Sequence, residues 1–189
     1  MITTFLYILF LNAVAWGEVI PLNVTALSSR DGISVIQCWQ LASIPEEARS
    51  AMNYDLGDMD MATWSIIQPR TTVGEAWAPN VLLTMVLNGL IRVTAPAPVA
   101  NESSSTPSLA VDSTVAGLPE TTHTAYLMPG SVVSSMVIAA DIKAVSTIRG
   151  HFTEFPSDEA TVLVQIPFRG GKAPEHKILY DGQCRSGKE

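Results

Sequence analysis

His151 is the residue of this sequence best suited to move a proton. It follows Gly150, and an imidazole titrates in the pH range that general acid–base catalysis requires. If the segment is a strand, alternation places His151 and Thr153 on one face and Glu154 on the other. His151 would then point into the interior while Glu154 faces outward. The alternative is a histidine that is hydrogen-bonded within the core or at a strand edge and has no part in catalysis.

Two carboxylates are further candidates for acid–base chemistry. Glu75 lies two residues before Trp77, and a carboxylate in dry, aromatic surroundings holds its proton more tightly and can donate it. A solvated loop glutamate is the competing interpretation. Asp141 stands in a turn-like segment, so we interpret it as a turn residue first and a site residue second. We therefore predict His151 and Glu75 as the catalytic residues, with His151 as the proton carrier.

Large aromatic side chains are candidates for a binding wall. Aromatic-lined cavities suit polycyclic or terpenoid ligands, because stacking and area burial need no specific polar partner. Ordinary core packing explains the same side chains without any function. Trp77 is the best exception, since it stands in an irregular segment. The substrate-binding residues that we predict are Trp77, Trp64, Trp39 and Tyr54.

Metal and cofactor motifs are absent from the sequence. The three histidines, His123, His151 and His176, show neither H-x-H nor H-x3-H spacing, so a joint metal site would depend wholly on the fold. The nucleotide-binding patterns G-x-G-x-x-G and G-x4-G-K-[ST] do not occur, nor do G-x-S-x-G and H-E-x-x-H. We expect no catalytic metal and no cofactor.

The elements that would position these residues are short β-rich segments. Residues 81–94 are apolar on both sides of Asn88-Gly89, a pair suited to a type I′ turn, and predict a central hairpin. Residues 44–50 predict one helical turn, and 71–80 an irregular approach to the hairpin. The other expected strands are 33–41, which follows the turn pair Asp31-Gly32, then 61–68, 124–127, 136–140, 145–148, 161–168 and an edge strand at 177–180.

This pattern of strands indicates an all-β sandwich or small barrel, because turn signals recur regularly and no sustained helical period occurs. Residues 95–122 are rich in Pro, Ser, Thr and Ala and show neither a helical period nor strand alternation, so we expect a long surface loop there. The chain of 189 residues fits a single domain.

Five short motifs carry a resemblance to a known family. They are QCWQL at 37–41, GHFTEFPSD at 150–158, VQIPF at 164–168, PEHK at 174–177 and the G-x-C that ends at Cys184. Together they resemble small secreted cupin-like proteins of filamentous fungi. The resemblance implies a single jelly-roll β-barrel whose mouth often holds a ligand, and some of these relatives belong to secondary-metabolite gene clusters.

Metal-binding cupins carry two motifs, G-x5-H-x-H-x3,4-E-x6-G and G-x5-P-x-G-x2-H-x3-N. Anchored on Gly89, the first motif puts Leu82 at the carboxylate position, and either two alanines or Glu75 and Trp77 at the histidine positions. In the second motif the histidine position falls near Val133. Neither motif keeps a histidine, which disfavours the metal-dependent members of the family.

The N-terminus indicates entry into the secretory pathway. Residues 1–17 read as a signal peptide, since an apolar run too short to span a bilayer leads into small-x-small cleavage patterns. That segment has no Lys or Arg before the apolar run, and an uncleaved anchor or a buried first strand is the alternative. The domain would then comprise 18–189, with sequons at Asn23 and Asn101 as glycosylation acceptors.

Cys38 and Cys184 are the two cysteines of the chain, and an oxidising compartment would let them pair. Such a disulfide would tie the C-terminal segment onto an early strand. Two buried free thiols are the alternative.

Net charge and composition narrow the function. A net charge of −7 without a basic run argues against nucleic acid and against anionic membranes. We expect a secreted, metal-independent enzyme of the lyase or isomerase class, promoting cyclisation, isomerisation or dehydration of an apolar polyketide or terpenoid intermediate of fungal specialised metabolism. The alternatives are a non-catalytic extracellular binding or structural protein, and a metal-dependent oxidase or dioxygenase. Exposed edge strands would permit a homodimer.

Overall fold

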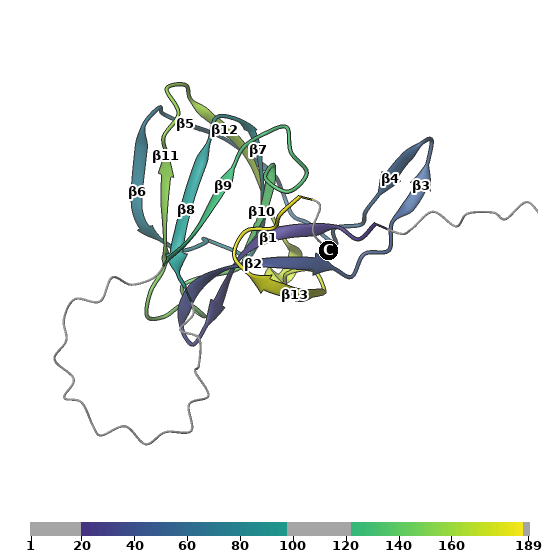
Figure 1. The fold of residues 1–189 in the computed structure, drawn as a ribbon, viewed down its shortest axis with the longest axis horizontal. Coiled ribbons are helices and arrows are strands. Elements are labelled where there is room, and N and C mark those ends of the chain that lie inside the picture. Colours follow the sequence, from purple (N-terminus) through teal and green to yellow (C-terminus); the bar gives the residue numbers. More distant parts are fainter. Residues whose placement is uncertain (1–19, 98–121, 187–189) are drawn as a thin grey trace, which may run out of the picture.

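The chain folds into β-strands, as shown by a computed structural model that describes residues 20–97 and 122–186 (Figure 1). The described strands form three sheets of seven, four and two strands. The predicted all-β class is therefore confirmed. Within the described residues the sheets are open, so the closed barrel that we expected is not seen.

The larger sheet has the strand order β13-β2-β1-β10-β7-β12-β5. The strands are β13 (His176–Asp181), β2 (Ile33–Leu41), β1 (Asn23–Arg30), β10 (Met136–Ala139), β7 (Leu82–Asn88), β12 (Thr161–Pro167) and β5 (Thr63–Ile67). Its pairs are antiparallel except for β1 with β10, which run parallel.

The second sheet has the order β6-β11-β8-β9 and is antiparallel throughout. Its strands are β6 (Thr71–Ala76), β11 (His151–Phe155), β8 (Ile91–Pro96) and β9 (Thr122–Leu127). A separate small sheet pairs β3 (Glu46–Ala48) with β4 (Ala51–Asn53), and a short 3-10 helix covers Arg169–Gly171. Figure 1 shows β6, β11, β8 and β9 as one layer facing the larger sheet.

The main core lies between these two layers. Alternate residues of both sheets point into it, including Leu82, Val86 and Leu163 from the larger sheet and Val93, Ala125 and Leu127 from the smaller one. Each strand thus presents one apolar face to the interior, as expected of a two-sheet sandwich. The arrangement fixes which side chains can line an internal cavity.

A second core covers the opposite face of the larger sheet. Trp39, Leu83 and Ile138 are buried there, and Tyr54 and Leu56 from the segment around β3 and β4 pack against them. Because residues i and i+1 of a strand face opposite ways, Leu82 belongs to the main core and Leu83 to this second one. The two cores are separated by the sheet itself.

The predicted hairpin at Asn88-Gly89 is wrong. β7 pairs with β10 and β12, while β8 pairs with β11 and β9, so the chain crosses from one sheet to the other at this point. Gly89 has φ +82° and packs against Thr161, but Asn88 does not have a positive φ, so the type I′ geometry is not formed. The Asn88 side chain instead donates to the Ala160 carbonyl at 2.8 Å.

A tight hairpin does occur at Asp31-Gly32, between β1 and β2. Both residues have positive φ, 52° and 77°, which a type I′ turn requires. The sequence identified this pair as a turn and the following strand with its observed bounds. It did not predict β1, whose partly buried start contains the Asn23 sequon.

Three other local predictions are wrong. Residues 44–50 do not form a helical turn, because Arg49 and Ser50 adopt positive φ and connect β3 to β4 as a hairpin. Residues 71–76 form the strand β6 instead of an irregular segment. Residues 145–148 form no strand; they belong to the connection between β10 and β11. Most of the expected loop at 95–122 lies outside the described residues.

The disulfide between Cys38 and Cys184 is present and closes a sequence separation of 146 residues. It joins β2 to the segment after β13, as predicted. The Cys184 amide also donates to Thr25 Oγ1 at 3.1 Å, so the C-terminal segment is held against both β2 and β1. A disulfide fits an oxidising, secretory compartment.

Candidate functional site

A buried histidine–aspartate pair lies at the edge of the main core. His151 Nδ1 is 2.5 Å from Asp141 Oδ2, and the same oxygen accepts a 2.7 Å hydrogen bond from Ser34 Oγ. Asp141 and Ser34 are fully enclosed and His151 is 7% exposed. An ionised carboxylate can only accept, so the proton of a neutral imidazole ring must reside on Nδ1. Nε2 is then the unprotonated nitrogen.

The pair is positioned by the connection between β10 and β11. Asp141 stands two residues after the end of β10, and the amide of the intervening Ala140 donates to the Leu27 carbonyl of β1. Further along, the Arg149 carbonyl accepts from Ser34, so both ends of this connection are hydrogen-bonded to the β1–β2 hairpin. β11 then begins at His151. The sequence separation of only ten residues lets a single connection deliver both partners.

His151 lines a cavity of about 170 Å³ between the two sheets. As the alternation predicts, Thr153 and Phe155 line it with His151, whereas Phe152 is exposed and Glu154 pairs with Arg92 at 2.6 Å. The remaining wall is mainly apolar. Among the described residues, no hydrogen bond engages His151 Nε2, so this nitrogen has no partner within the described protein.

The segment after β6 forms a solvent-exposed part of the cavity wall, called here the mouth. Trp77 is half-buried and Pro79 is exposed, and both line the cavity. The Trp77 indole donates to the Ser146 carbonyl at 2.7 Å, and Lys143 Nζ lies 3.4 Å from the ring centroid. A Cβ at Gly150 would overlap the Ala76 carbonyl and lie 2.9 Å from the Trp77 ring, so glycine is required there.

Three neutral polar side chains also line the cavity. Thr84 and Gln165 are cross-strand partners on β7 and β12, and Thr153 lies on β11. None of the three makes a side-chain hydrogen bond to another described residue. Sequence reasoning missed Thr84 and Gln165, although their alternation with Leu82, Val86 and Leu163 was a usable signal that they face the interior.

Glu75 lies outside the cavity. It is an exposed residue of β6, and its Oε1 accepts a 2.9 Å hydrogen bond from the Gly150 amide. This position matches the solvated interpretation more closely than a dry, aromatic one. The hydrogen bond between Glu75 and the Gly150 amide holds the start of β11, next to His151. Glu75 itself does not contact the cavity.

The predicted aromatic wall is not assembled at one site. Trp77 lines the cavity, whereas Trp39 and Tyr54 lie in the second core across the larger sheet. Trp64 is 62% exposed on the edge strand β5. The residues of the group therefore face three different environments, and one of the four, Trp77, is close to His151.

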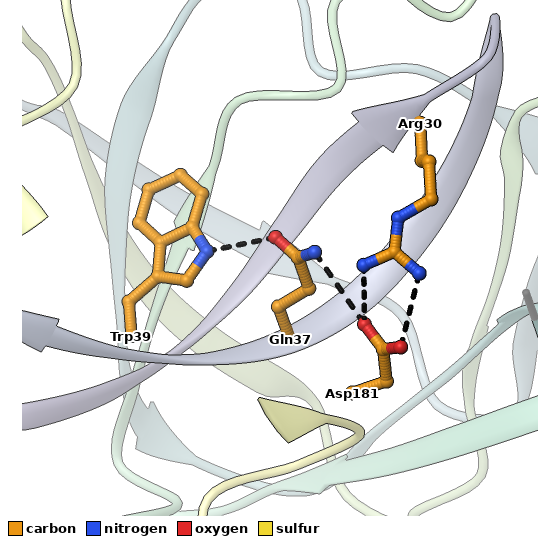
Figure 2. A network of polar contacts seen from close by, with 4 residues as sticks. All are labelled: Arg30, Gln37, Trp39 and Asp181. Carbon is orange, nitrogen blue, oxygen red and sulfur yellow. Dashed lines mark hydrogen bonds and ion pairs between the residues drawn. The ribbon is translucent and has the colours of Figure 1, made fainter. Parts of the chain in front are cut away.

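Trp39 belongs to a polar network of the larger sheet (Figure 2). Its indole donates to Gln37 at 2.9 Å, and Gln37 approaches Asp181, which forms a two-point ion pair with Arg30. The Arg30 guanidinium holds the pKa of Asp181 below its ordinary value of 3.8, with a smaller contribution from Gln37. The pKa of Arg30 is correspondingly raised. This network joins β1, β2 and β13 and contains no cavity-lining residue.

The three histidines lie apart. His123 is on β9, His151 is at the cavity, and His176 on β13 stacks on Trp39 with ring centroids 3.5 Å apart. Over residues 20–97 and 122–186, no group of three or more His, Cys, Asp or Glu side chains is arranged to hold a metal ion. The same ranges contain no helix long and apolar enough to cross a membrane.

Two of the predicted processing features fall outside the described residues: the signal peptide at 1–17 and the Asn101 sequon. Asn23 is described and is half-buried at the start of β1, where its Oδ1 is enclosed without a hydrogen-bond partner. The Thr25 of this sequon is fully buried.

Comparison with known proteins identifies no relative. No protein family matches the chain, and neither a curated protein nor a solved structure does. The fold and the site therefore define the class only as an all-β protein with an intrachain disulfide, a cavity between its two sheets and a buried His–Asp pair.

Proposed function

We propose that the protein is a secreted, metal-independent enzyme of the isomerase or lyase class that uses His151 as its general base. The observation that carries this proposal is the hydrogen bond from His151 to the fully buried Asp141 at the wall of a cavity. Such a carboxylate orients the ring and stabilises the imidazolium that forms when Nε2 takes a proton. The wall around the ring is mainly apolar, which favours the exclusion of water once a substrate fills the cavity.

The size of the cavity constrains the substrate. An apolar cavity of about 150 Å³ in another protein accommodates benzene, whereas pockets for larger ligands measure about 300–1,000 Å³. At about 170 Å³, this cavity suits one ring or a compact bicycle. We therefore propose isomerisation or dehydration of a small molecule, in preference to cyclisation of a polycyclic polyketide or terpenoid.

The cupin-like resemblance is part of this proposal. A jelly roll is built from two facing sheets, and this chain has two facing sheets with a cavity between them. The parallel pairing of β1 with β10 departs from an antiparallel jelly roll. The acid–base role of His151 rests on its own geometry and does not require the resemblance.

A substrate-independent test of the base is the elimination of benzisoxazole. A base removes the ring C–H proton, the N–O bond breaks, and a cyanophenolate forms, which is followed by its absorbance. We expect His151→Gln to lower the rate about 100-fold or more relative to the parent, since a general base contributes about 10²–10⁴-fold. His123→Gln, on β9 and away from the cavity lining, should keep the parent rate. No rate above buffer in the parent, or equal rates in the parent and His151→Gln, would contradict the proposal.

A second candidate function is non-catalytic binding through the edge strand β5, with a homodimer as the assembly. Trp64 and Ile66 are each 62% exposed on this strand, which carries no charged residue, whereas the opposite edge β13 contains Lys177 and Asp181. Charges on an edge discourage pairing, and an uncharged apolar edge permits it. Sedimentation equilibrium tests this candidate: a dimer that Trp64→Ser dissociates supports it, and a monomeric parent rules it out.

A further inference from the structure

We infer that the substrate of this cavity is a small, neutral carbonyl compound, held through its oxygen by Gln165 and Thr84 so that His151 can remove the neighbouring C–H proton. This inference deepens the proposed function and rests on it. The polar side chains of the cavity wall are few, and three of them, Thr84, Thr153 and Gln165, are uncharged and make no side-chain hydrogen bond to another described residue.

The cavity wall contains few groups that can carry a charge. Among the described residues that line the cavity, His151 is the only ionisable side chain. A carboxylate or phosphate substrate would bring a charge into an apolar space without a cation to neutralise it, and burial of an unpaired charge is strongly unfavourable. Lys143 is exposed, with its Nζ 3.4 Å from the centroid of the Trp77 ring, and is not among the residues that line the cavity. The wall therefore selects a neutral molecule.

Gln165 and Thr84 are the hydrogen-bond donors that could bind a substrate oxygen. Gln165 and Thr84 face each other as cross-strand partners, and neither side chain bonds to another described residue. A glutamine amide supplies N–H donors and a threonine hydroxyl supplies one more. Two convergent donors suit a carbonyl oxygen, and they suit even better the negative oxygen of the enolate that follows proton removal.

His151 and the Thr84–Gln165 pair lie on opposite walls of the cavity. Asp141 lies two residues beyond Ala139, which pairs with Leu82, whereas Thr84 pairs with Val137 on the other side of Leu82. Four residues of a strand span roughly 13 Å, and facing sheets pack roughly 10 Å apart, so a substrate must lie in the space between the His151–Asp141 pair and the Thr84–Gln165 pair. His151 comes from one sheet and the Thr84–Gln165 pair from the other, and all three side chains line the same cavity.

The reaction that this geometry supports is proton transfer next to a carbonyl group. His151 Nε2 takes a proton from the carbon beside the carbonyl, the C–H bond breaks, and its electron pair moves to the carbonyl oxygen as an enolate. Return of a proton from Nε2 to the same carbon restores the ketone. Return to a different carbon isomerises an unsaturated one. No oxidant, reductant or leaving group is needed.

The test uses cyclohexanone as the probe and cyclohexanecarboxylate as its charged counterpart. Titration of the parent, followed by amide NMR, should show saturable shifts of the Gln165 side-chain amide with the ketone and not with the carboxylate. Gln165→Met and Thr84→Val preserve approximate size while removing donors, and each should weaken ketone binding about five- to tenfold, the effect of one neutral hydrogen bond. Thermal unfolding verifies that both variants are folded.

Solvent exchange separates binding from chemistry. In heavy water the parent should incorporate deuterium beside the carbonyl of cyclohexanone, as read by mass spectrometry. His151→Gln should bind the ketone within about twofold of the parent, because it removes no carbonyl donor, yet lose the exchange. Equal ketone affinity in the parent, Gln165→Met and Thr84→Val, or equal binding of the carboxylate, would overturn the inference while leaving benzisoxazole elimination as the measure of the base. Exchange that persists in His151→Gln would overturn the base as well.

Discussion

His151 Nδ1 and Asp141 Oδ2 lie 2.5 Å apart, and the carboxylate has no access to solvent. Because Asp141 belongs to the connection between β10 and β11, the position of this connection determines the orientation of the His151 ring. The hydrogen bond places Nε2 as the nitrogen that can react with a molecule in the cavity.

Replacement of Asp141 by Asn should lower the rate of benzisoxazole elimination at least about 10-fold; the corresponding Asp→Asn change beside the histidine of a Ser-His-Asp triad costs about 10⁴-fold. The amide has the same shape but no charge, so it no longer stabilises the imidazolium and no longer enforces the Nδ1 proton. Asp141 is a positioning residue, and cyclohexanone affinity should therefore stay at the parent value. Ser34→Ala, which removes only the second hydrogen bond to the carboxylate, should have a smaller effect on the rate. Parent-level elimination in Asp141→Asn would rule out the orienting role.

Replacement of Gly150 by Ala should destabilise the protein by about 1–3 kcal/mol, the cost of inserting a methyl group into a filled space. The new Cβ would overlap the Ala76 carbonyl and press on the Trp77 ring, so the mouth of the cavity and the start of β11 must both shift. Chemical denaturation measures the free energy of unfolding. Ala144→Ser, an exposed change in the same connection, should alter it by less than about 0.5 kcal/mol. If the two variants are equally stable, the close contact at Gly150 does not constrain the site.

Asp181→Asn should lower stability at neutral pH, and the difference from the parent should disappear in acid. The Arg30 ion pair lowers the pKa of Asp181 in the folded protein. Its contribution is therefore fully present above the ordinary value of 3.8 and is lost as the pH falls through the lower folded pKa. Denaturation curves at several pH values measure the difference. Asp158→Asn, from the highly exposed pair with Arg70, should have little effect at any pH. A difference that grows toward acid would contradict this assignment.

Loss of the Cys38–Cys184 disulfide should lower the free energy of unfolding by about 5 kcal/mol. The bond closes a separation of 146 residues, and in the chain-entropy model a long loop restricts the unfolded chain strongly. Urea denaturation of the parent with and without reductant, together with the double Cys→Ala variant, measures this contribution. Reductant should leave the double variant unchanged, which controls for other effects of the reagent. Identical midpoints for the parent and the double variant would show that the bond does not stabilise the fold.

The inward face of β11 could be predicted from sequence, because strand alternation is a local property. His151, Thr153 and Phe155 line the cavity as two-residue periodicity requires. The disulfide was also predictable, since two cysteines in an oxidising compartment leave one pairing. These inferences need no knowledge of how the sheets are arranged.

The crossing at Asn88-Gly89 could not be predicted from the local sequence. An Asn-Gly pair between apolar runs favours a hairpin, yet β7 and β8 each have better partners in separate sheets. The same limitation applies to Trp39 and Trp64. Whether each side chain is buried or exposed depends on which side of the larger sheet other segments cover, and that coverage is a property of the tertiary structure.

Asp141 was underestimated because nothing local distinguishes a buried aspartate from a turn aspartate. Its burial depends on Ser34 of β2 and on hydrogen bonds between the 140–150 connection and the β1–β2 hairpin. The partnership with His151 thus emerges only when strands distant in sequence are placed together. Thr84 and Gln165 were missed for a related reason, since polar residues at inward positions acquire meaning only once a cavity is known.

The most direct test of the central claim is nitrogen NMR of the His151 ring in protein labelled at its histidines, recorded at a pH where the ring is neutral. Nδ1 should carry the proton, hydrogen-bonded to Asp141, and Nε2 should be unprotonated. In Asp141→Asn this preference should weaken. A ring protonated at Nε2 in the parent would contradict the account, because the nitrogen available to the cavity would then be a donor and not a base.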